Sequence, residues 1–84
     1  MAAKSFSARV TVTLKRGVLD PQGKATQSAL GSLGFEGVGS VRQGKIFDVE
    51  LTASSKKGAK EALESMCEKL LANTVIEDYD VVVE

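Results

Sequence analysis

The stretch Gly17 to Lys24, GVLDPQGK, contains the residue types of a phosphate-binding loop. Such loops hold phosphate groups on backbone N–H groups, in the pattern GxxxxGK[ST]. Here the glycines stand one residue too far apart, and Ala25 follows the lysine. The same residues suit a strand-to-helix turn, because Gly17 can bend the chain, Asp20 can cap a helix and Pro21 can occupy its first position. The stretch therefore predicts a turn, and no phosphate site is required.

The other reactive side chains do not form a catalytic set. Cys67 is the only cysteine and lies beside Met66 on the apolar stripe of an expected helix, which predicts a buried thiol. The chain has no histidine, so the commonest general base is missing. Glu77, Asp78 and Asp80 alternate between the faces of an expected strand and do not converge on one metal ion. We expect no catalytic residue, bound cofactor or metal in this chain.

Length and composition restrict the class of protein. The 84 residues suffice for one small domain, which we expect to span 1–84, and the 43% hydrophobic content suits a globular fold. Eleven Lys and Arg balance eleven Asp and Glu, so the charge that drives nucleic-acid binding is missing. No apolar segment is long enough to span a membrane, and a secretion signal is not recognisable. We expect a soluble, cytoplasmic protein.

Alternation and helix signals predict the first half of the fold. Residues 6–14 alternate apolar and polar side chains, with Phe6, Ala8, Val10, Val12 and Leu14 on one face, as in a strand buried on one side. A helix is expected from Asp20-Pro21 onward. Its apolar side is formed by Thr26, Ala29, Leu30 and Leu33. Gly34 is placed to end this helix in the left-handed conformation, with Phe35 folding back on Leu30.

A hairpin, a second helix and a last strand are expected next. The hairpin pairs 38–42 with 45–52 through a turn at Gln43-Gly44. Ser54-Ser55 begins the second helix, which ends near Asn73-Thr74. The residues expected on its apolar stripe are Ala59, Ala62, Leu63, Met66, Cys67 and Leu70. The last strand has Tyr79, Val81 and Val83 in phase.

This order is βαββαβ, and right-handed crossovers predict an α+β, ferredoxin-like fold with an antiparallel sheet and both helices on one face. If Phe47 and Val81 face the helices, Ile46 and Val82 point to the other side of the sheet. Apolar side chains on both faces favour association, so we expect at least a dimer. Arg42 and Lys45 flank the expected hairpin tip. They either form an anion site or, as we favour, keep the sheet edge soluble.

The fold alone does not decide the function. An RNA-recognition domain needs aromatic residues on the open sheet face, where the first strand has Arg9, Thr11 and Thr13 instead. A metal carrier of this topology needs paired cysteines. Two classes remain: a regulatory module of the ACT type that binds a small ligand at a dimer interface, and a subunit that assembles with an enzyme.

Four stretches then resemble a known family. VTVTLKRGVLDPQGKA, LGF, VRQGK and NTVIEDY occur in the order found in the PurS family, the small subunits of phosphoribosylformylglycinamidine (FGAM) synthase. The resemblance extends from about Arg9 to Tyr79, and GVLDPQG is its most specific part. One difference is Asn73-Thr74, where the family usually has Asn-Pro, so we expect a less rigid turn after the second helix.

The resemblance implies a non-catalytic, dimeric subunit of de novo purine synthesis. Its partners would be the large synthetase subunit, PurL, which binds ATP, magnesium and the ribonucleotide, and the glutaminase subunit, PurQ. The small subunit would join these enzymes so that ammonia passes between them. Our candidate residues for the partner interface are Lys15, Arg16, Gln22, Arg42, Lys45, Ile46 and Val82. Lys15, Arg16 and Gln22 are included because the turn itself does not need them.

Overall fold

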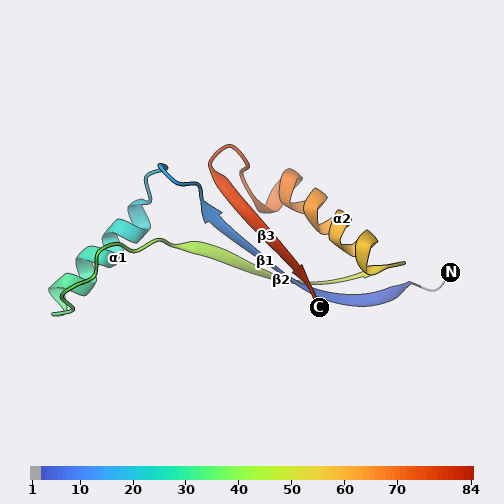
Figure 1. Cartoon of the computed structure of the whole chain (residues 1–84), viewed down its shortest axis with the longest axis horizontal. Helices are drawn as coiled ribbons and strands as arrows, with labels where there is room; N and C mark the ends of the chain where they lie inside the picture. Colours follow the sequence, from blue (N-terminus) through green and yellow to red (C-terminus); the bar gives the residue numbers. More distant parts are fainter. Residues whose placement is uncertain (1–2) are drawn as a thin grey trace.

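Residues 3–84 are described by a computed structural model, in which three strands form a sheet and the helices lie at two separate places (Figure 1). In chain order the elements are β1 (Lys4–Leu14), α1 (Pro21–Ser32), β2 (Gly44–Ala53), α2 (Lys56–Met66), the π-helical turn η1 (Cys67–Leu71) and β3 (Glu77–Val83). The sheet is antiparallel with the order β2-β1-β3, so the predicted α+β class and antiparallel sheet are confirmed. A single domain over 1–84 stays a prediction, and residues 1 and 2 lie outside the described residues.

The core lies between β1 and α2. The alternation predicted for β1 is confirmed, because Ala8, Val10 and Val12 are buried and the residues between them are not. α2 begins as predicted at Ser55, whose hydroxyl accepts a hydrogen bond from the Gly58 N–H at 3.0 Å. The other members of the core are Ala59, Leu63, Cys67, Ala72 and Val83. Tyr79 and Val81 pack against this cluster, which confirms the phase of the last strand.

The π-helical turn η1 corrects the predicted apolar stripe. Leu70 is 83% exposed, although a regular helical period places it on the core side. The Ala72 N–H donates to the Cys67 carbonyl, five residues earlier, so this turn holds one more residue than an α-helical turn. The extra residue rotates the chain, and Leu71 packs on the core in place of Leu70.

The predicted hairpin at Gln43-Gly44 is wrong. Residues 38–43 form no strand, and β2 begins at Gly44. A two-residue hairpin turn needs a positive φ at one or both central residues. Positive φ is found at Gly17, Gly34 and Gly37, and at neither position of the predicted turn. The chain therefore runs straight from 38–43 into β2.

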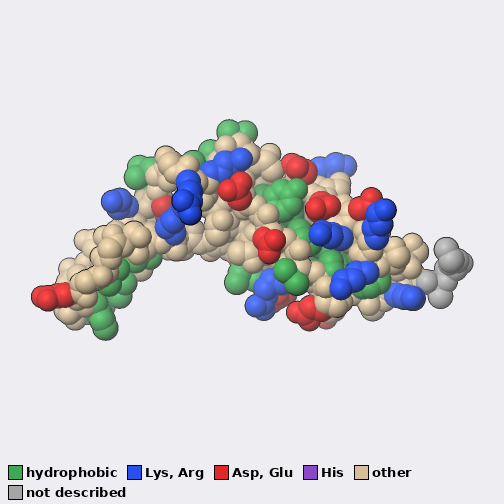
Figure 2. Space-filling model, in the orientation of Figure 1, with side chains coloured by type: hydrophobic (Ala, Val, Ile, Leu, Met, Phe, Trp, Pro, Cys, Tyr) green, Lys and Arg blue, Asp and Glu red, His purple; other side chains and the backbone are tan. Residues whose placement is uncertain are grey.

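Helix α1 is formed as predicted, but it does not lie on the sheet of its own protomer. Residues 17–43, which we call the arm, extend beyond one end of the sheet (Figure 1). The radius of gyration is 16.8 Å, whereas a compact chain of this length has about 12 Å. The apolar side of α1 is therefore left in solvent, with Leu33 74% and Phe35 59% exposed. Figure 2 shows hydrophobic side chains along one side of the arm, at the lower left of the view.

Leu63→Ala should lower the free energy of unfolding by about 2–5 kcal/mol, because a fully buried leucine leaves a cavity in a small core. Leu70→Ala is the matched control, since the same change at an exposed site should cost less than about 0.5 kcal/mol. Urea unfolding followed by circular dichroism measures both. Equal losses for the two variants would contradict the position of η1.

Candidate functional site

The candidate site is the junction where the arm leaves the sheet. Here the end of β1, the start of α1, the start of β2 and the start of β3 come together around an open hollow of about 450 Å³. Its polar lining includes Asp20, Gln22, Gln43, Lys45 and Glu77. Two of these residues, Gln22 and Lys45, were predicted as partner contacts, and in the structure both make contacts within the protomer, Gln22 with Gln43 and Lys45 with Glu77.

Asp20 makes two hydrogen bonds that close the arm. One carboxylate oxygen accepts from the Gly23 N–H at 2.9 Å, as a helix N-cap does, and the other accepts from the Gln43 N–H at 2.8 Å. The bond from Gly23, and after it the bond from Gln43, lowers the pKa of Asp20 below its ordinary value, because both stabilise the charged carboxylate. Asp20 thus joins the start of α1 to the segment that enters β2.

Gly23 allows this closure. It is the only buried residue of α1, and a Cβ atom at this position would overlap the Val41 carbonyl oxygen and the Asp20 carboxylate. The arm is closed further by the Gln43 side-chain amide, which donates to the Gln22 side-chain oxygen at 3.1 Å, and by Gln27, which donates to the Gly39 carbonyl at 3.2 Å. The helix and the returning chain therefore form one unit.

The predicted C-terminal end of α1 is confirmed at the backbone. Gly34 has a φ of +93°, its N–H donates to the Gly31 carbonyl, and the Phe35 N–H donates to the Leu30 carbonyl at 3.0 Å. This pair of bonds is the Schellman motif. With Asp20 at one end and Gly34 at the other, both helix ends are satisfied without help from the sheet.

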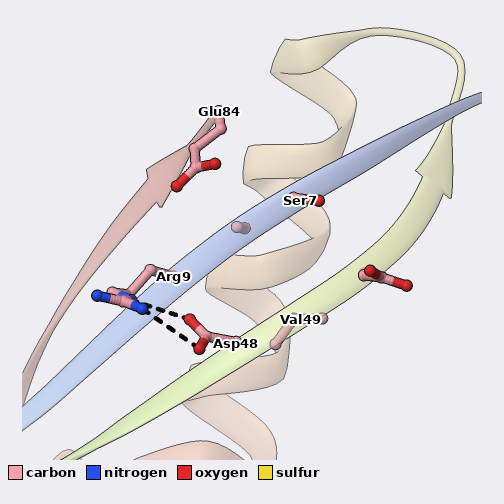
Figure 3. Close-up of a pocket in the computed structure, with 7 residues that line it drawn as sticks. Ser7, Arg9, Asp48, Val49 and Glu84 are labelled. Atoms are coloured by element: carbon pink, nitrogen blue, oxygen red, sulfur yellow. Dashed lines mark hydrogen bonds and ion pairs between the residues drawn. The ribbon is translucent and has the colours of Figure 1, made fainter.

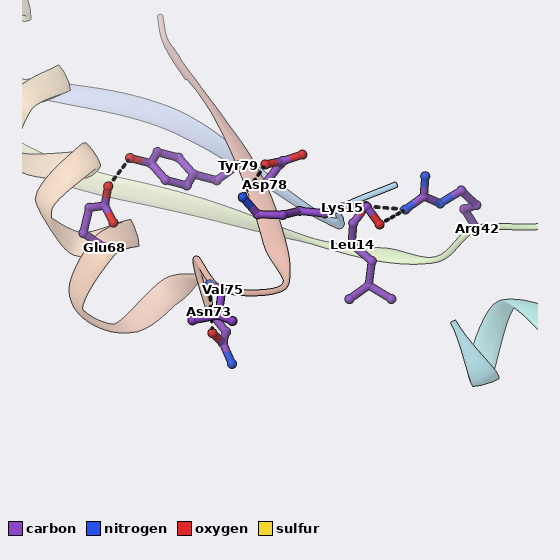
Figure 4. A network of polar contacts seen from close by, with 8 residues as sticks. All are labelled: Leu14, Lys15, Arg42, Glu68, Asn73, Val75, Asp78 and Tyr79. Atoms are coloured by element: carbon purple, nitrogen blue, oxygen red, sulfur yellow. Dashed lines mark hydrogen bonds and ion pairs between the residues drawn. The ribbon is translucent and has the colours of Figure 1, made fainter. Parts of the chain in front are cut away.

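Arg42 ties the arm to β1 (Figure 4). Its guanidinium donates to the carbonyl oxygens of Leu14 and Lys15, the latter at 3.2 Å. The anion site that we considered for Arg42 and Lys45 is not supported, because these carbonyls and a carboxylate hold the two cations: Lys45 Nζ lies 3.8 Å from Glu77. Both were assigned to the tip of a hairpin that does not form.

The remaining candidates divide between the junction and the sheet. Lys15 pairs with Asp78 at 3.6 Å, and its carbonyl accepts from Arg42 (Figure 4). Gln22 and Lys45 line the hollow of the same junction. Arg16 is exposed in the turn that follows β1. Ile46 and Val82, 59% and 52% exposed, lie away from the core on the open sheet face, as predicted.

The open sheet face carries an ion pair that the sequence analysis missed. Arg9 donates to both oxygens of Asp48, at 2.9 and 3.3 Å, and Figure 3 shows this pair across β1 and β2. The guanidinium lowers the pKa of Asp48. Only the pairing register of β1 with β2 sets Arg9 opposite Asp48, and the alternation of side chains does not reveal a register.

The thiol of Cys67, the metal-ligating side chains and the N-terminus of α1 are the other places where the described chain could supply chemistry. Cys67 is fully buried, as predicted. Burial is the main cause that raises the pKa of its thiol, and the negative charges of Glu64 and Glu68 raise it further. Within residues 3–84 no three metal-ligating side chains form a group. The Asp20 carboxylate occupies the N-terminus of α1, where a phosphate-binding loop would hold its anion. None of the helices in this part of the chain has the length and apolar character that crossing a bilayer requires.

The turn that follows η1 is held by two polar side chains. The Asn73 side-chain oxygen accepts from the Val75 N–H at 3.2 Å (Figure 4). The Asn73 N–H donates to the Glu77 carboxylate at 2.7 Å. These bonds bracket Thr74, the position at which the family usually has proline. That this turn is less rigid than its proline counterpart stays a prediction.

Known proteins are similar to this chain in sequence and in fold. The family model PurS, phosphoribosylformylglycinamidine (FGAM) synthase, matches residues 7–84. The phosphoribosylformylglycinamidine synthase subunit PurS of Synechocystis is 49% identical over 75 residues, which cover 89% of this chain and 75% of the relative. The structure of Bacillus subtilis PurS is similar with a TM-score of 0.84 at 47% identity, over 94% of this chain and 98% of that one.

A chain in the structure of PurLQS from Thermotoga maritima is similar as well. Its TM-score is 0.87 at 31% identity, and the match covers 96% of this chain and 99% of that chain. Because these matches extend over nearly the whole chain, the extended arm is part of the similarity.

Asp20→Asn and Asp20→Ala together separate the two bonds of this carboxylate. Asparagine keeps one acceptor for the helix cap and loses the acceptor for the Gln43 N–H, whereas alanine loses both. We expect the thermal midpoint of α1 to fall by roughly 4–8 °C for alanine and by less for asparagine. The thermal midpoint is measured by following the helical circular dichroism signal during heating.

The pH dependence provides the control. Because the folded pKa of Asp20 is lowered, its stabilisation is present above the unfolded pKa of about 3.9 and is lost as the pH falls through the folded pKa. The difference in thermal midpoint between wild type and Asp20→Ala should therefore be constant near neutral pH and shrink below about pH 4. A difference that does not change with acidification would contradict an ionised Asp20 at the junction.

Proposed function

The chain belongs to the PurS family of FGAM synthase, and we propose that it is the non-catalytic small subunit of this enzyme in de novo purine synthesis. In this proposal it acts in the cytoplasm as a homodimer or larger oligomer. It joins a synthetase subunit, PurL, to a glutaminase subunit, PurQ, and assists the transfer of ammonia between them. ATP and magnesium belong to the synthetase subunit.

The observation that carries the proposal is the arm. A capped helix that leaves its apolar side in solvent is suited to association, because burying apolar surface stabilises a complex by roughly 25 cal/mol per Å². The similar chain in the structure of PurLQS from Thermotoga maritima belongs to an assembly, and it shares this fold over nearly the whole length of both chains. The geometry of the junction supports a scaffold, since its charged residues bind one another and the backbone.

A second copy of the chain is the occupant that fits the arm. The predicted hairpin would place 38–42 along the free edge of β2 and α1 on the face that α2 covers. Since the chain runs straight through Gln43-Gly44, one protomer cannot make these contacts with its own sheet. Two copies that exchange arms can make all of them, which is domain swapping. Phe47, Val49 and Leu51, which are half-buried in the protomer, would then be covered further.

The dimer is tested by placing charge on the arm. Leu33→Asp/Phe35→Asp should raise the dimer dissociation constant at least about tenfold, because two exposed apolar side chains would meet the partner as carboxylates. Leu70→Asp, at an exposed leucine outside the arm, is the control and should leave it unchanged. Sedimentation velocity measures both. A strictly monomeric wild type at micromolar concentration would contradict the exchange of arms.

The role in ammonia transfer is tested by changing the nitrogen source. If this subunit couples two active sites, omitting it should reduce glutamine-dependent FGAM synthesis at least about tenfold and change ammonium-dependent synthesis by less than about twofold. Held-together sites make the transfer effectively intramolecular, whereas excess ammonium removes the need for it. Both rates are measured as product formation by the synthetase with and without this chain, once with glutamine and the glutaminase subunit and once with excess ammonium. Equal loss of both activities would contradict coupling.

Charge reversals can then locate the docking surface. Arg16→Glu is the most direct probe, because Arg16 is exposed in the turn beside the junction. Arg42→Glu and Lys45→Glu also break contacts inside the protomer, so their effects on stability must be measured first.

A further inference from the structure

The outer edge of β3 has unpaired backbone groups at regular positions. Two ladder bonds at its ends set the alternation: the Glu84 N–H donates to the Ser7 carbonyl, and the Lys15 N–H donates to the Ile76 carbonyl, both at 2.9 Å. In an antiparallel pair, alternate residues bond to the neighbouring strand. Even-numbered residues of β3 therefore bond to β1. Tyr79, Val81 and Val83 direct their N–H and carbonyl groups outward, where no strand of residues 3–84 lies beside β3.

A hollow of about 500 Å³ lies against this edge. Its lining consists of Val81, Val82 and Val83 together with three lysines at the start of α2: Lys56, Lys57 and Lys60. The side chain of Val82 lies on the opposite face of the sheet from those of its two neighbours. A hollow that touches all three valines must therefore reach the edge of the strand.

The charge beside the edge changes sign between the start of α2 and η1. Among the described residues the ion pairs are Arg9–Asp48, Lys15–Asp78 and Lys45–Glu77, and none includes a lysine of this hollow. At the other end of the edge, Tyr79 donates a hydrogen bond to Glu68 at 3.2 Å. The edge thus has cations beside Val81–Val83 and a carboxylate beside Tyr79.

We propose that this edge binds an extended acidic segment of a partner subunit as an added strand, with carboxylates of that segment facing the three lysines. Main-chain hydrogen bonds at an open edge supply affinity, and side-chain pockets supply specificity. Charge complementarity favours a partner subunit over a second copy. Of the acidic residues that a second β3 would bring, Glu77 is engaged by Lys45 and Asn73, and Asp78 by Lys15. Asp80 alternates with the core-facing Tyr79 and Val81, so it lies on the face of the sheet opposite to α2 and its lysines. The inference rests on the proposed function, because the partner is a subunit of the same complex.

Amide hydrogen exchange tests the edge without a mutation. In the isolated protein, the N–H groups of Tyr79, Val81 and Val83 should exchange rapidly and those of Asp80 and Val82 slowly. Adding the synthetase and glutaminase subunits should slow exchange at Val81 and Val83 by at least about tenfold. Nuclear magnetic resonance of the labelled small subunit, followed after complex formation and dissociation, measures each amide.

Charge reversal tests the lysines. Lys57→Glu/Lys60→Glu should weaken binding to the synthetase and glutaminase subunits at least about tenfold and reduce its salt dependence. Lys4→Glu/Lys69→Glu changes the net charge equally at exposed sites outside the hollow and outside the arm, and it should have little effect. Thermal unfolding and sedimentation of both variants show whether either change acts through the fold or the dimer.

Three outcomes would overturn the inference. Protection of Val81 and Val83 in the isolated protein would place a second copy on this edge. A complex that forms without protection, and with equal affinity for both double variants, would place the partner elsewhere and leave the proposed function intact. Failure of the wild-type chain to bind either subunit, with no effect on glutamine-dependent synthesis, would overturn the proposed function and this inference together.

Discussion

The arm depends on the carboxylate of Asp20, which binds the first turn of α1 and the chain entering β2 at the same time. A helix of twelve residues is marginal in water unless it packs against something or its ends are satisfied. Here the cap, the Schellman bonds at Gly34 and the close approach allowed by Gly23 replace packing on the sheet. The arm is consequently a formed element with an apolar side that its own protomer does not use.

The sheet imposes a second constraint, because three strands have two faces and two edges and α2 covers one face only. The exchange of arms proposed above would complete the covered face and the edge of β2. The edge of β3 and the open face with Arg9 and Asp48 would then remain for other subunits. A small subunit that joins larger enzymes needs several separate surfaces, and an elongated chain of 58 × 25 × 15 Å presents them with few residues.

Local features of the fold could be predicted because their causes are local. Alternation in β1, the caps at Asp20 and Ser55, and the end of α1 at Gly34 each follow from residues within one turn or one strand. The π-helical turn η1 could not be predicted, since its widened turn is chosen by how the chain packs on the core. The pairing of Arg9 with Asp48 depends on register, which two strands acquire only when they meet.

The amino-acid sequence by itself determined the types of β1, α1, β2, α2 and β3, the face that each strand buries, and the family, because periodicity, caps and motif spacing are properties of neighbouring residues. Only the tertiary structure decided whether 38–43 turns back on β2 or runs straight into it. That choice depends on the Gln43 N–H, which Asp20 binds from the other side of the arm. The same hydrogen bond joins residues that are 23 positions apart. A pattern read along the chain records the types of these two residues, but their contact exists only after the arm has closed.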